Sequence, residues 1–498
     1  PLYAILLGAL SRFGLPVEWW GHWVSVAAWI ISAWTALALF RQHDRPAAGA
    51  VAALFLAVLP LGVPTLGMET ATLLALLLLS AWAWTGDRPV LAPLFSVLAV
   101  LTRLDAGLLV VLLFAARSVS RRRILWRQAL LSAALALPWF AYATWRYGSP
   151  LPNSVLAKVN QNQLMEVSGS VSFIAQFVRH LTDGSPLLAV AMVVALAVGL
   201  YAIVRYARAW WWLPAWVILY IGTYTALNVA STFPWYFVPP LAGLALTAAL
   251  GLGHLLGDSV AAPVRPGANL QRAAAGLACA GVILIFQGRG ALADSINDRP
   301  GYLPEYREAG AWLAANTDPM ARVAAIEIGV IGYLSGSPIL DTMGLVSPEL
   351  RGHLVGWEET LTYALWQVEP AYLVTLTGTG WDTLTPQWWF RGQYRGAATF
   401  GRVSIYERQP AGPPAGYAVA ERVEFTEGFA VTGFETARQT LTPGETLTLL
   451  LHVDVARTPP SDCEVVLHLE DAATFGLISE AKERPYGGGY SCAAWQPG

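Results

Sequence analysis

The sequence predicts an all-α membrane domain with many spans, followed by an extracytoplasmic α/β domain and a partial β-sandwich. Three observations support this fold class. Apolar runs fill residues 1–290 and are separated by short charged clusters. After Arg289 the charge density rises to that of an ordinary soluble protein. From Tyr417 onward the apolar residues alternate in short runs divided by proline and glycine, which is typical of strands. We therefore expect domains at residues 1–290, 291–412 and 413–498.

The composition of the 498-residue chain fits a membrane protein and excludes several other classes. Hydrophobic residues make up 55% of the chain and charged residues only 13%, about half the usual charged fraction. The net charge of −2 gives no reason to expect a nucleic-acid partner. The sequence has no phosphate-binding Gly-Lys-Ser/Thr loop, so ATP hydrolysis is not expected. No cofactor is required by any motif, and a divalent metal stays open.

The three cysteines have different expected roles. Cys279 lies in an apolar run and is expected to be inert. Cys463 and Cys492 lie in the soluble tail and could form a disulfide if that tail is extracytoplasmic.

Ten apolar stretches in residues 1–290 are candidates for membrane spans. A helix needs about 20 residues to cross a hydrocarbon core of ~30 Å. The fourth and fifth stretches are short, and residues 1–14 form an apolar helix that is too short to span. The ten stretches are residues 22–40, 47–63, 67–85, 89–102, 105–117, 124–146, 186–204, 209–227, 234–256 and 271–288.

Arginine and lysine are divided unequally between alternate loops, and this predicts the orientation. The loops of one side carry Arg103, Arg146, Lys158 and Arg179 only. The loops of the other side carry many more cations and are therefore expected in the cytoplasm. An even number of spans places residue 1 and the soluble tail together outside a cell (inner) membrane. The cytoplasmic set is Arg41, Arg45, Arg88, Arg117, Arg121, Arg122, Arg123, Arg127, Arg205, Arg208, Arg265 and Arg272.

Polar residues gather at the outer ends of the spans. The span interiors hold almost no ionisable residues, which argues against ion-coupled transport. Four outward-facing segments, residues 67–70, 102–107, 146–158 and 228–239, hold sparse cations and carboxylates that could bind a lipid phosphate and a polar head group. Simpler interpretations stay open, because such residues also complement helix N-termini, lie in solvated turns or form an aromatic interfacial belt.

These segments carry a resemblance to a known family. They read Gly67-Met68-Glu69-Thr70, then Thr102-Arg103-Leu104-Asp105-Ala106-Gly107, then Tyr147-Gly148-Ser149-Pro150-Leu151-Pro152-Asn153-Ser154 followed by Lys158. In order and sidedness, residues 1–410 resemble the multi-spanning glycosyltransferases of the GT-C fold. Terminal arabinofuranosyltransferases of mycobacterial cell walls are similar, and protein mannosyltransferases and lipid A aminoarabinose transferases more distantly so.

The resemblance implies a hexosyl- or pentosyltransferase that uses a polyprenyl-phosphate sugar as donor. The acceptor would be a glycan, lipid or protein outside the cytoplasm, with membrane lipid around the enzyme. Arg103 and Lys158 would bind the donor phosphate, and Glu69 and Asp105 would support catalysis. Substrate contacts would come from Asn153, Trp235 and Tyr236. The sequence departs from the family at Leu104 and Ala106, where proline and glycine are usual, and at Trp235, where an arginine is common.

The catalytic base of the family is an aspartate in the first outer loop. Pro1-Leu2-Tyr3-Ala4 resembles the short apolar helix that follows this loop, so we expect the aspartate to lie upstream of Pro1. The sequence also stops in a turn-like Trp495-Gln496-Pro497-Gly498. We therefore expect a fragment that lacks the first span and first outer loop and is inactive by itself.

The soluble tail begins with alternating helix and strand signals. A helix is predicted at 302–317, with strands at 322–328, around 339–341, at 372–376 and at 402–407. Glu327 and Asp341 could contact an acceptor or hold the structure. Strand patterns at 445–451 and 464–469 then indicate a β-sandwich of a carbohydrate-binding type, truncated at its C-terminus.

Two other functions compete with glycosyl transfer. The protein could be a transporter or flippase of lipid-linked glycans that uses a polar groove. It could also be a non-catalytic membrane scaffold whose tail binds glycans. The sequence does not distinguish the sugar, the acceptor or the linkage.

Overall fold

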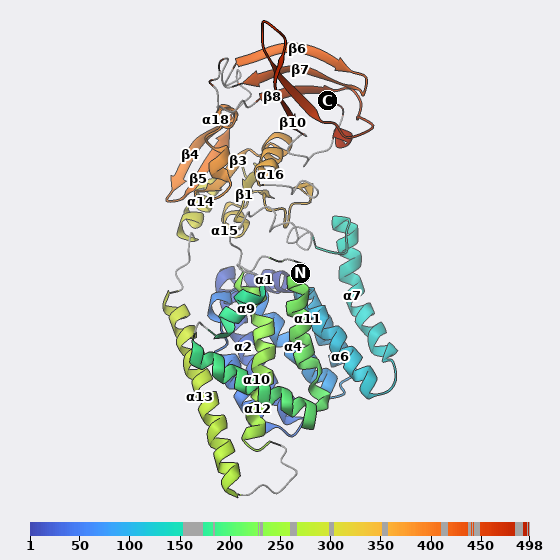
Figure 1. Cartoon of the computed structure of the whole chain (residues 1–498), viewed down its shortest axis with the longest axis vertical. Coiled ribbons are helices and arrows are strands. Elements are labelled where there is room, and N and C mark those ends of the chain that lie inside the picture. The colour runs from blue at the N-terminus through green and yellow to red at the C-terminus, as the bar shows by residue number, and fades with distance from the viewer. Residues whose placement is uncertain are drawn as a thin grey trace. The chain divides into compact units, whose positions relative to one another are not determined.

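The computed structural model divides into two compact units, each described here by itself (Figure 1). The helical unit comprises residues 1–151 and 169–298, and the sheet unit lies in residues 299–498. The structure describes residues 1–152, 173–182, 185–227, 229, 233–258, 266–297, 303–350, 357–409, 417–436, 440, 442, 449–483, 492–495 and 497.

Each of the ten predicted apolar stretches overlaps one helix of the described part of the helical unit. Shorter pieces lie between them, namely α1 Leu2–Leu10, η1 Ser11–Phe13, η2 Val63–Thr65, α9 Phe173–Thr182, η3 Arg208–Trp210 and η4 Pro234–Tyr236. The ten helices are α2 Val17–Arg41, α3 Pro46–Ala57, α4 Glu69–Thr85, α5 Leu91–Thr102, α6 Ala106–Ser120, α7 Trp126–Tyr147, α10 Pro186–Tyr206, α11 Trp212–Ala226, α12 Val238–Leu255 and α13 Pro266–Asn297.

Among the described residues, four helical segments are both long and apolar enough to cross a membrane alone. They are Val17–Arg41, Pro186–Tyr206, Pro234–Leu255 and Leu270–Ala293. Helices α3 and α5 have 12 residues each, so at 1.5 Å per residue they span about 18 Å. Together with the many exposed large apolar side chains of α2, α7 and α10, this is the architecture of a multi-pass membrane protein.

Helix α12 forms the centre of the helical unit. Its apolar residues are buried nearly all round, which is typical of a core helix. Glycines allow α10 and α12 to cross closely. A Cβ atom at Gly199 would lie 2.2 Å from the Thr247 carbonyl oxygen, and one at Gly251 would lie 2.4 Å from the Gly199 nitrogen. Small residues at such crossings let helix backbones approach and pack without a side chain between them.

The N-terminal part of the sheet unit is a five-stranded mixed sheet with helices on both faces. The strand order is β2-β1-β3-β5-β4, with β1 parallel to β2 and β3 and the other pairs antiparallel. Side chains alternate, so Val323 and Ala325 pack against α14 and α15, whereas Ala324 packs on the other face. The bounds are α14 Leu303–Asn316, β1 Val323–Ala325, α15 Ile328–Ser335, β2 Ile339–Asp341, η5 Pro348–Leu350, α16 Trp357–Tyr363, η6 Ala364–Val368, β3 Tyr372–Leu376, α17 Trp381–Leu384, α18 Trp388–Gln393, β4 Tyr394–Phe400 and β5 Val403–Arg408.

Two antiparallel sheets follow in the C-terminal part, where the sequence predicts a sandwich. One has the order β6-β7-β8 and the other pairs β9 with β10. The bounds are β6 Tyr417–Phe425, β7 Phe429–Thr436, β8 Leu449–Val455, β9 Val465–Glu470, β10 Leu477–Glu483 and η8 Cys492–Ala494. Cys463 and Cys492 form a disulfide, as the sequence allowed. The helical region followed by a sheet-containing region confirms the predicted fold class.

Candidate functional site

An arginine–aspartate pair lies where α5 ends and α6 begins. Arg103 has an extended backbone that stops α5, and Asp105 occupies the N-cap position of α6. The guanidinium binds the carboxylate through two atoms, Nε to Oδ1 at 3.2 Å and Nη2 to Oδ2 at 2.6 Å. Both side chains are nearly buried, with 11% and 12% of their area exposed. This two-point contact therefore fixes the orientation of the guanidinium.

Two tyrosines of α11 complete the environment of Asp105. The hydroxyls of Tyr220 and Tyr224 donate to Asp105 Oδ2 at 2.8 and 2.7 Å, and their rings stack at 4.5 Å. One carboxylate oxygen thus accepts from the arginine and from both tyrosines. Because its hydrogen-bonding capacity is used, Asp105 is built to hold Arg103 and is poorly placed to take a proton from a substrate.

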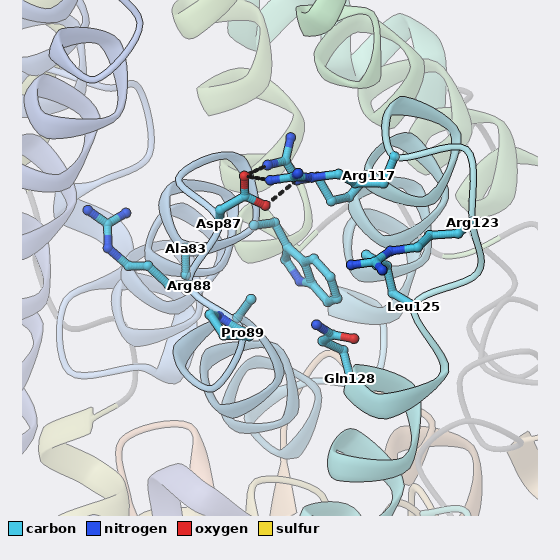
Figure 2. Close-up of a pocket in the computed structure, with 11 residues that line it drawn as sticks. Ala83, Asp87, Arg88, Pro89, Arg117, Arg123, Leu125 and Gln128 are labelled. Atoms are coloured by element: carbon cyan, nitrogen blue, oxygen red, sulfur yellow. Dashed lines mark hydrogen bonds and ion pairs between the residues drawn. The ribbon is translucent and has the colours of Figure 1, made fainter.

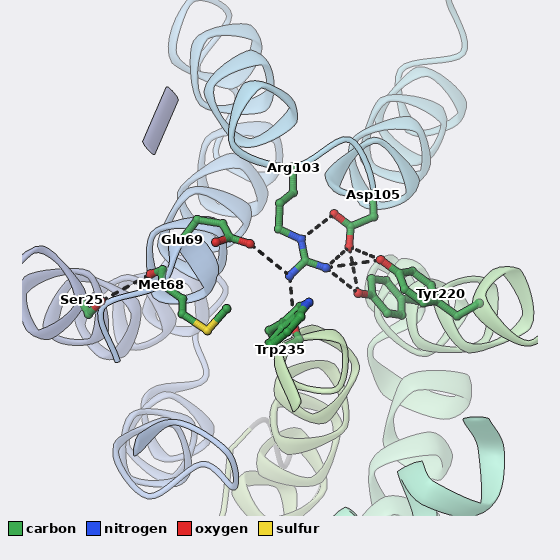
Figure 3. A network of polar contacts seen from close by, with 8 residues as sticks. Ser25, Met68, Glu69, Arg103, Asp105, Tyr220 and Trp235 are labelled. Atoms are coloured by element: carbon green, nitrogen blue, oxygen red, sulfur yellow. Dashed lines mark hydrogen bonds and ion pairs between the residues drawn. The ribbon is translucent and has the colours of Figure 1, made fainter. Parts of the chain in front are cut away.

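The remaining side of Arg103 faces Glu69 and the short helix η4. Its Nη1 donates to the Trp235 carbonyl oxygen at 3.2 Å and lies 4.0 Å from Glu69 Oε1 (Figure 3). The Glu69 side chain is 30% exposed, more than either partner in the arginine–aspartate pair. Glu69 is therefore the carboxylate of this cluster with most freedom to contact a ligand.

The turn before Glu69 is held by residues far away in the sequence. The Gly67 N–H donates to Ser25 Oγ at 3.0 Å, and the Tyr3 hydroxyl donates to the Gly67 carbonyl at 2.7 Å. Gly67 has a φ of +85°, which favours glycine because a side chain is strained there. Helices α1 and α2 thus position the first turn of α4 and its carboxylate.

The structure brings most of the predicted site residues together. Glu69, Arg103, Asp105 and Trp235 are in contact as described above. Tyr236 is buried, and its ring centre lies 5.3 Å from the Arg103 guanidinium carbon. Asn153 and Lys158 lie outside the described residues. Within the described part of the chain, no group of three or more His, Cys, Asp or Glu side chains could hold a metal ion.

Four residues of the site were not predicted, namely Tyr3, Ser25, Tyr220 and Tyr224. The tyrosines of α11 did leave a signal, because two hydroxyls one helical turn apart in an apolar helix need partners. Helix α9 was also missed, and its Phe173 packs on Tyr224 at 5.3 Å. It therefore covers one side of the tyrosine pair.

Asp341 of the sheet unit has a structural environment. It is fully buried and accepts hydrogen bonds from the backbone N–H groups of Met343 and Val346 at 2.9 and 3.0 Å. Burial raises the pKa of its carboxyl above the ordinary value, although these N–H groups oppose the shift. Both oxygens hold the loop after β2, so contact with an acceptor is not their role in this conformation.

Comparisons with known proteins agree with this architecture. Residues 297–420 match the model of a domain of unknown function (DUF8728). No curated protein matches the chain. The fold is similar to the crystal structure of ArnT from Cupriavidus metallidurans in the apo state, with a TM-score of 0.50 and 16% identity over 80% of this chain and 84% of that one. ArnT bound to undecaprenyl phosphate aligns with a TM-score of 0.49 and 16% identity over 80% and 85% of the two chains.

The apo ArnT match shows that this chain has the GT-C type of membrane fold. At 16% identity this comparison shows the fold alone, and it does not single out the mycobacterial arabinofuranosyltransferases to which the sequence also bears a resemblance.

Proposed function

We propose that this protein is a membrane glycosyltransferase that moves a sugar from a polyprenyl-phosphate donor to a glycan, lipid or protein acceptor outside the cytoplasm. The observation that carries the proposal is the cluster of Glu69, Arg103 and Asp105 at one end of a GT-C-type helical unit. The motifs around these residues resemble those of GT-C glycosyltransferases, which supports the same function.

The contacts assign different roles to the two carboxylates. Asp105 is a positioning residue, since it neutralises Arg103 and is itself held by Tyr220 and Tyr224. Glu69 is more exposed and orients the donor or the acceptor. This role for Glu69 is a supporting one, and we do not assign it as the catalytic base.

Binding of the donor phosphate needs more than Arg103. Its charge is offset by Asp105, and Glu69 adds a second negative charge within 4.0 Å. A phosphate would therefore be repelled unless another cation joins the site. Lys158 is our candidate for that cation. The Nη1 group of Arg103, which now bonds a backbone carbonyl, is the donor that would turn to the phosphate.

The sugar or the polyprenyl chain would contact Asn153, Trp235 and Tyr236. Of these, Trp235 is half-buried and its ring stacks on Phe233 at 4.7 Å, which gives a flat aromatic surface beside Arg103. Sugar rings and prenyl chains both pack well on such surfaces.

The location that fits this function is the cell (inner) membrane with the sheet unit outside. The Arg distribution predicts this orientation. The Cys463–Cys492 disulfide supports it, because disulfides persist in oxidising compartments and are rare in the cytosol.

Donor kinetics of the full-length protein test the proposal. Arg103→Lys keeps the charge but loses the two-point contact, so kcat/KM for a polyprenyl-phosphate sugar should fall by about 10- to 100-fold, which is ~1.4–2.8 kcal/mol. The matched control is Arg12→Lys, in an exposed turn after α1. Equal kinetics of both variants and the parent protein would contradict a donor role for Arg103.

A further inference from the structure

A cationic cavity lies at the opposite end of α6 from the candidate site. It has a volume of about 220 Å³ and is formed by the loop between α4 and α5 and the loop between α6 and α7. Four arginines and one aspartate line it, together with apolar residues that include Trp84, Pro89 and Leu125. Asp105 and Arg117 are 12 residues apart, so the helix separates the two sites by about 18 Å.

The cations of this cavity are only partly neutralised. Arg117 and Arg121 both pair with the carboxylate of Asp87. Burial alone would raise the pKa of Asp87, but the hydrogen bonds from these arginines lower it below its ordinary value. The guanidinium of Arg123 has no hydrogen-bond or ion-pair partner within the described part of the chain. The cavity therefore has an excess of positive charge and a free arginine at its rim.

The arrangement of the side chains favours a ligand inside the cavity. Figure 2 shows Arg123 and Gln128 pointing into the space beside Asp87 and Pro89. Arg88 extends away instead, where it bonds Gln42 Oε1 at 3.2 Å and lies over the Trp82 ring. The ligand would thus meet the guanidinium of Arg123, beside Arg117 and Arg121, whose two charges share the single carboxylate of Asp87.

The loop after α4 and the loop after α6 each contain one residue with a strained backbone conformation. Asp87 and Arg122 have φ values of +56° and +50°, in the left-handed region that favours glycine. Helices α4 and α6 both end just before such a left-handed residue. The backbone N–H of Arg88 then donates to the carbonyl oxygen of Ala83, and that of Arg123 donates to the carbonyl oxygen of Ser118. A non-glycine residue in this region is strained, and such strain gathers at functional sites. Here it places Asp87 and Arg123 on either side of the cavity.

A second, apolar groove is formed by α5, α6 and α7. It measures about 240 Å³ and is lined by Ser96, Val97, Val100, Val110, Ser132, Ala133 and Ala136. Trp84 lines the cavity and donates its indole N–H to Ser96 Oγ, which lines the groove, at 2.9 Å, so the two spaces are neighbours on either side of this contact. On α7 the step from Gln128 to Ser132 is one helical turn deeper into the membrane.

We propose that this cavity and groove form a binding site for an anionic membrane lipid, with its phosphate among Arg117, Arg121 and Arg123 and one acyl chain between α5, α6 and α7. A charged cavity beside an apolar groove fits a ligand with an anionic head and a hydrocarbon chain. A phosphate group matches the guanidinium donors, and a hydrocarbon chain matches the groove below them. A soluble phosphate ester would leave the apolar groove empty. A cytoplasmic orientation alone explains arginines in these loops, but it does not explain a cation-lined cavity with an apolar groove beside it.

Native mass spectrometry of the full chain in detergent tests the proposal with dioleoyl phosphatidylglycerol and phosphatidylcholine as probes. Phosphatidylglycerol should bind at least about tenfold more tightly, which is about 1.4 kcal/mol, because both lipids offer a phosphate but only phosphatidylcholine carries a cation that the arginines repel. Arg123→Gln should weaken phosphatidylglycerol by about tenfold and leave phosphatidylcholine unchanged. Since Arg123 has no partner in the fold, this variant is expected to fold.

One matched control separates the lipid site from a diffuse attraction of the surface charge. Arg122→Gln removes the same charge from the same turn, but Arg122 does not line the cavity. A twofold or smaller effect is expected. Equal losses for Arg122→Gln and Arg123→Gln would mean diffuse surface attraction and would overturn the proposal.

The groove has its own test. Ala133→Phe fills it and should weaken phosphatidylglycerol, whereas Leu130→Phe, on an exposed part of the same helix, should not. Glycerol 3-phosphate, measured by calorimetry, should bind at least tenfold more weakly than the lipid. If it binds equally well and Ala133→Phe has no effect, the cavity takes soluble phosphates and the lipid assignment is wrong.

Discussion

Asp105→Asn should destabilise the helical unit because it removes the charge that balances Arg103. Both side chains are nearly buried, and breaking a buried ion pair on one side costs about 3–5 kcal/mol. An amide also cannot accept all the hydrogen bonds that Arg103, Tyr220 and Tyr224 donate to Oδ2. With an unfolding entropy of about 2.1 cal/mol/K per residue, a loss of ~3 kcal/mol in a unit of this size lowers the Tm by about 5 °C.

A tyrosine variant tests whether the hydrogen bonds to Asp105 contribute to this stability. Tyr224→Phe alone should cost about 1.5–3 kcal/mol, since it removes one hydrogen bond to a charged group. The Asp105→Asn, Tyr224→Phe double variant should cost less than the sum, because both changes remove the same contact. Tyr201→Phe is the matched control, as its hydroxyl is 3.5 Å from the Tyr206 hydroxyl on an exposed face.

Thermal unfolding of purified protein in detergent, followed by tryptophan fluorescence, measures these effects. The account is refuted if Asp105→Asn unfolds at the same temperature as the Tyr201→Phe control. It is equally refuted if the double variant is fully additive.

Three further predictions concern other parts of the chain. Gly199→Ala should lower the Tm by several degrees, because the added Cβ would lie 2.2 Å from the Thr247 carbonyl oxygen. Such overpacking costs about 1–3 kcal/mol. The control Gly222→Ala should leave the Tm unchanged, since a Cβ there meets open space. Asp341→Ala should expose the sheet unit to limited proteolysis, since two buried N–H groups lose their acceptor at about 1–3 kcal/mol each. A cysteine at Ser120 should be shielded from an impermeant reagent in intact cells while one at Ser404 is labelled, and the reverse pattern would contradict the predicted orientation.

Much of the helical architecture could be predicted because apolar runs and rare charges are strong signals. Glu69, Arg103 and Asp105 stood out since few ionisable residues occur near the spans. Tyr220 and Tyr224 did not, because a tyrosine in an apolar run is equally consistent with a membrane interface. Their role depends on the packing of α11 against the start of α6, which no local pattern contains.

In the sheet unit, too, some elements could be predicted from the local sequence and others could not. Strand β3 was predicted at residues 372–376 and β2 around residues 339–341, where apolar runs are bounded by turns. Strand β4 was missed, because Gly396 and three small or polar neighbours weaken its alternation. Its pairing with β5 supplies what the local sequence lacks.

The most direct test of the central claim is sugar transfer by the full-length protein reconstituted with a radiolabelled polyprenyl-phosphate sugar and a membrane extract as acceptor source. The account predicts labelled acceptor from the parent protein. Glu69→Gln should reduce it at least about tenfold, through loss of the exposed carboxylate beside Arg103. Movement of the intact donor across the bilayer without any labelled acceptor would contradict the account and favour a flippase.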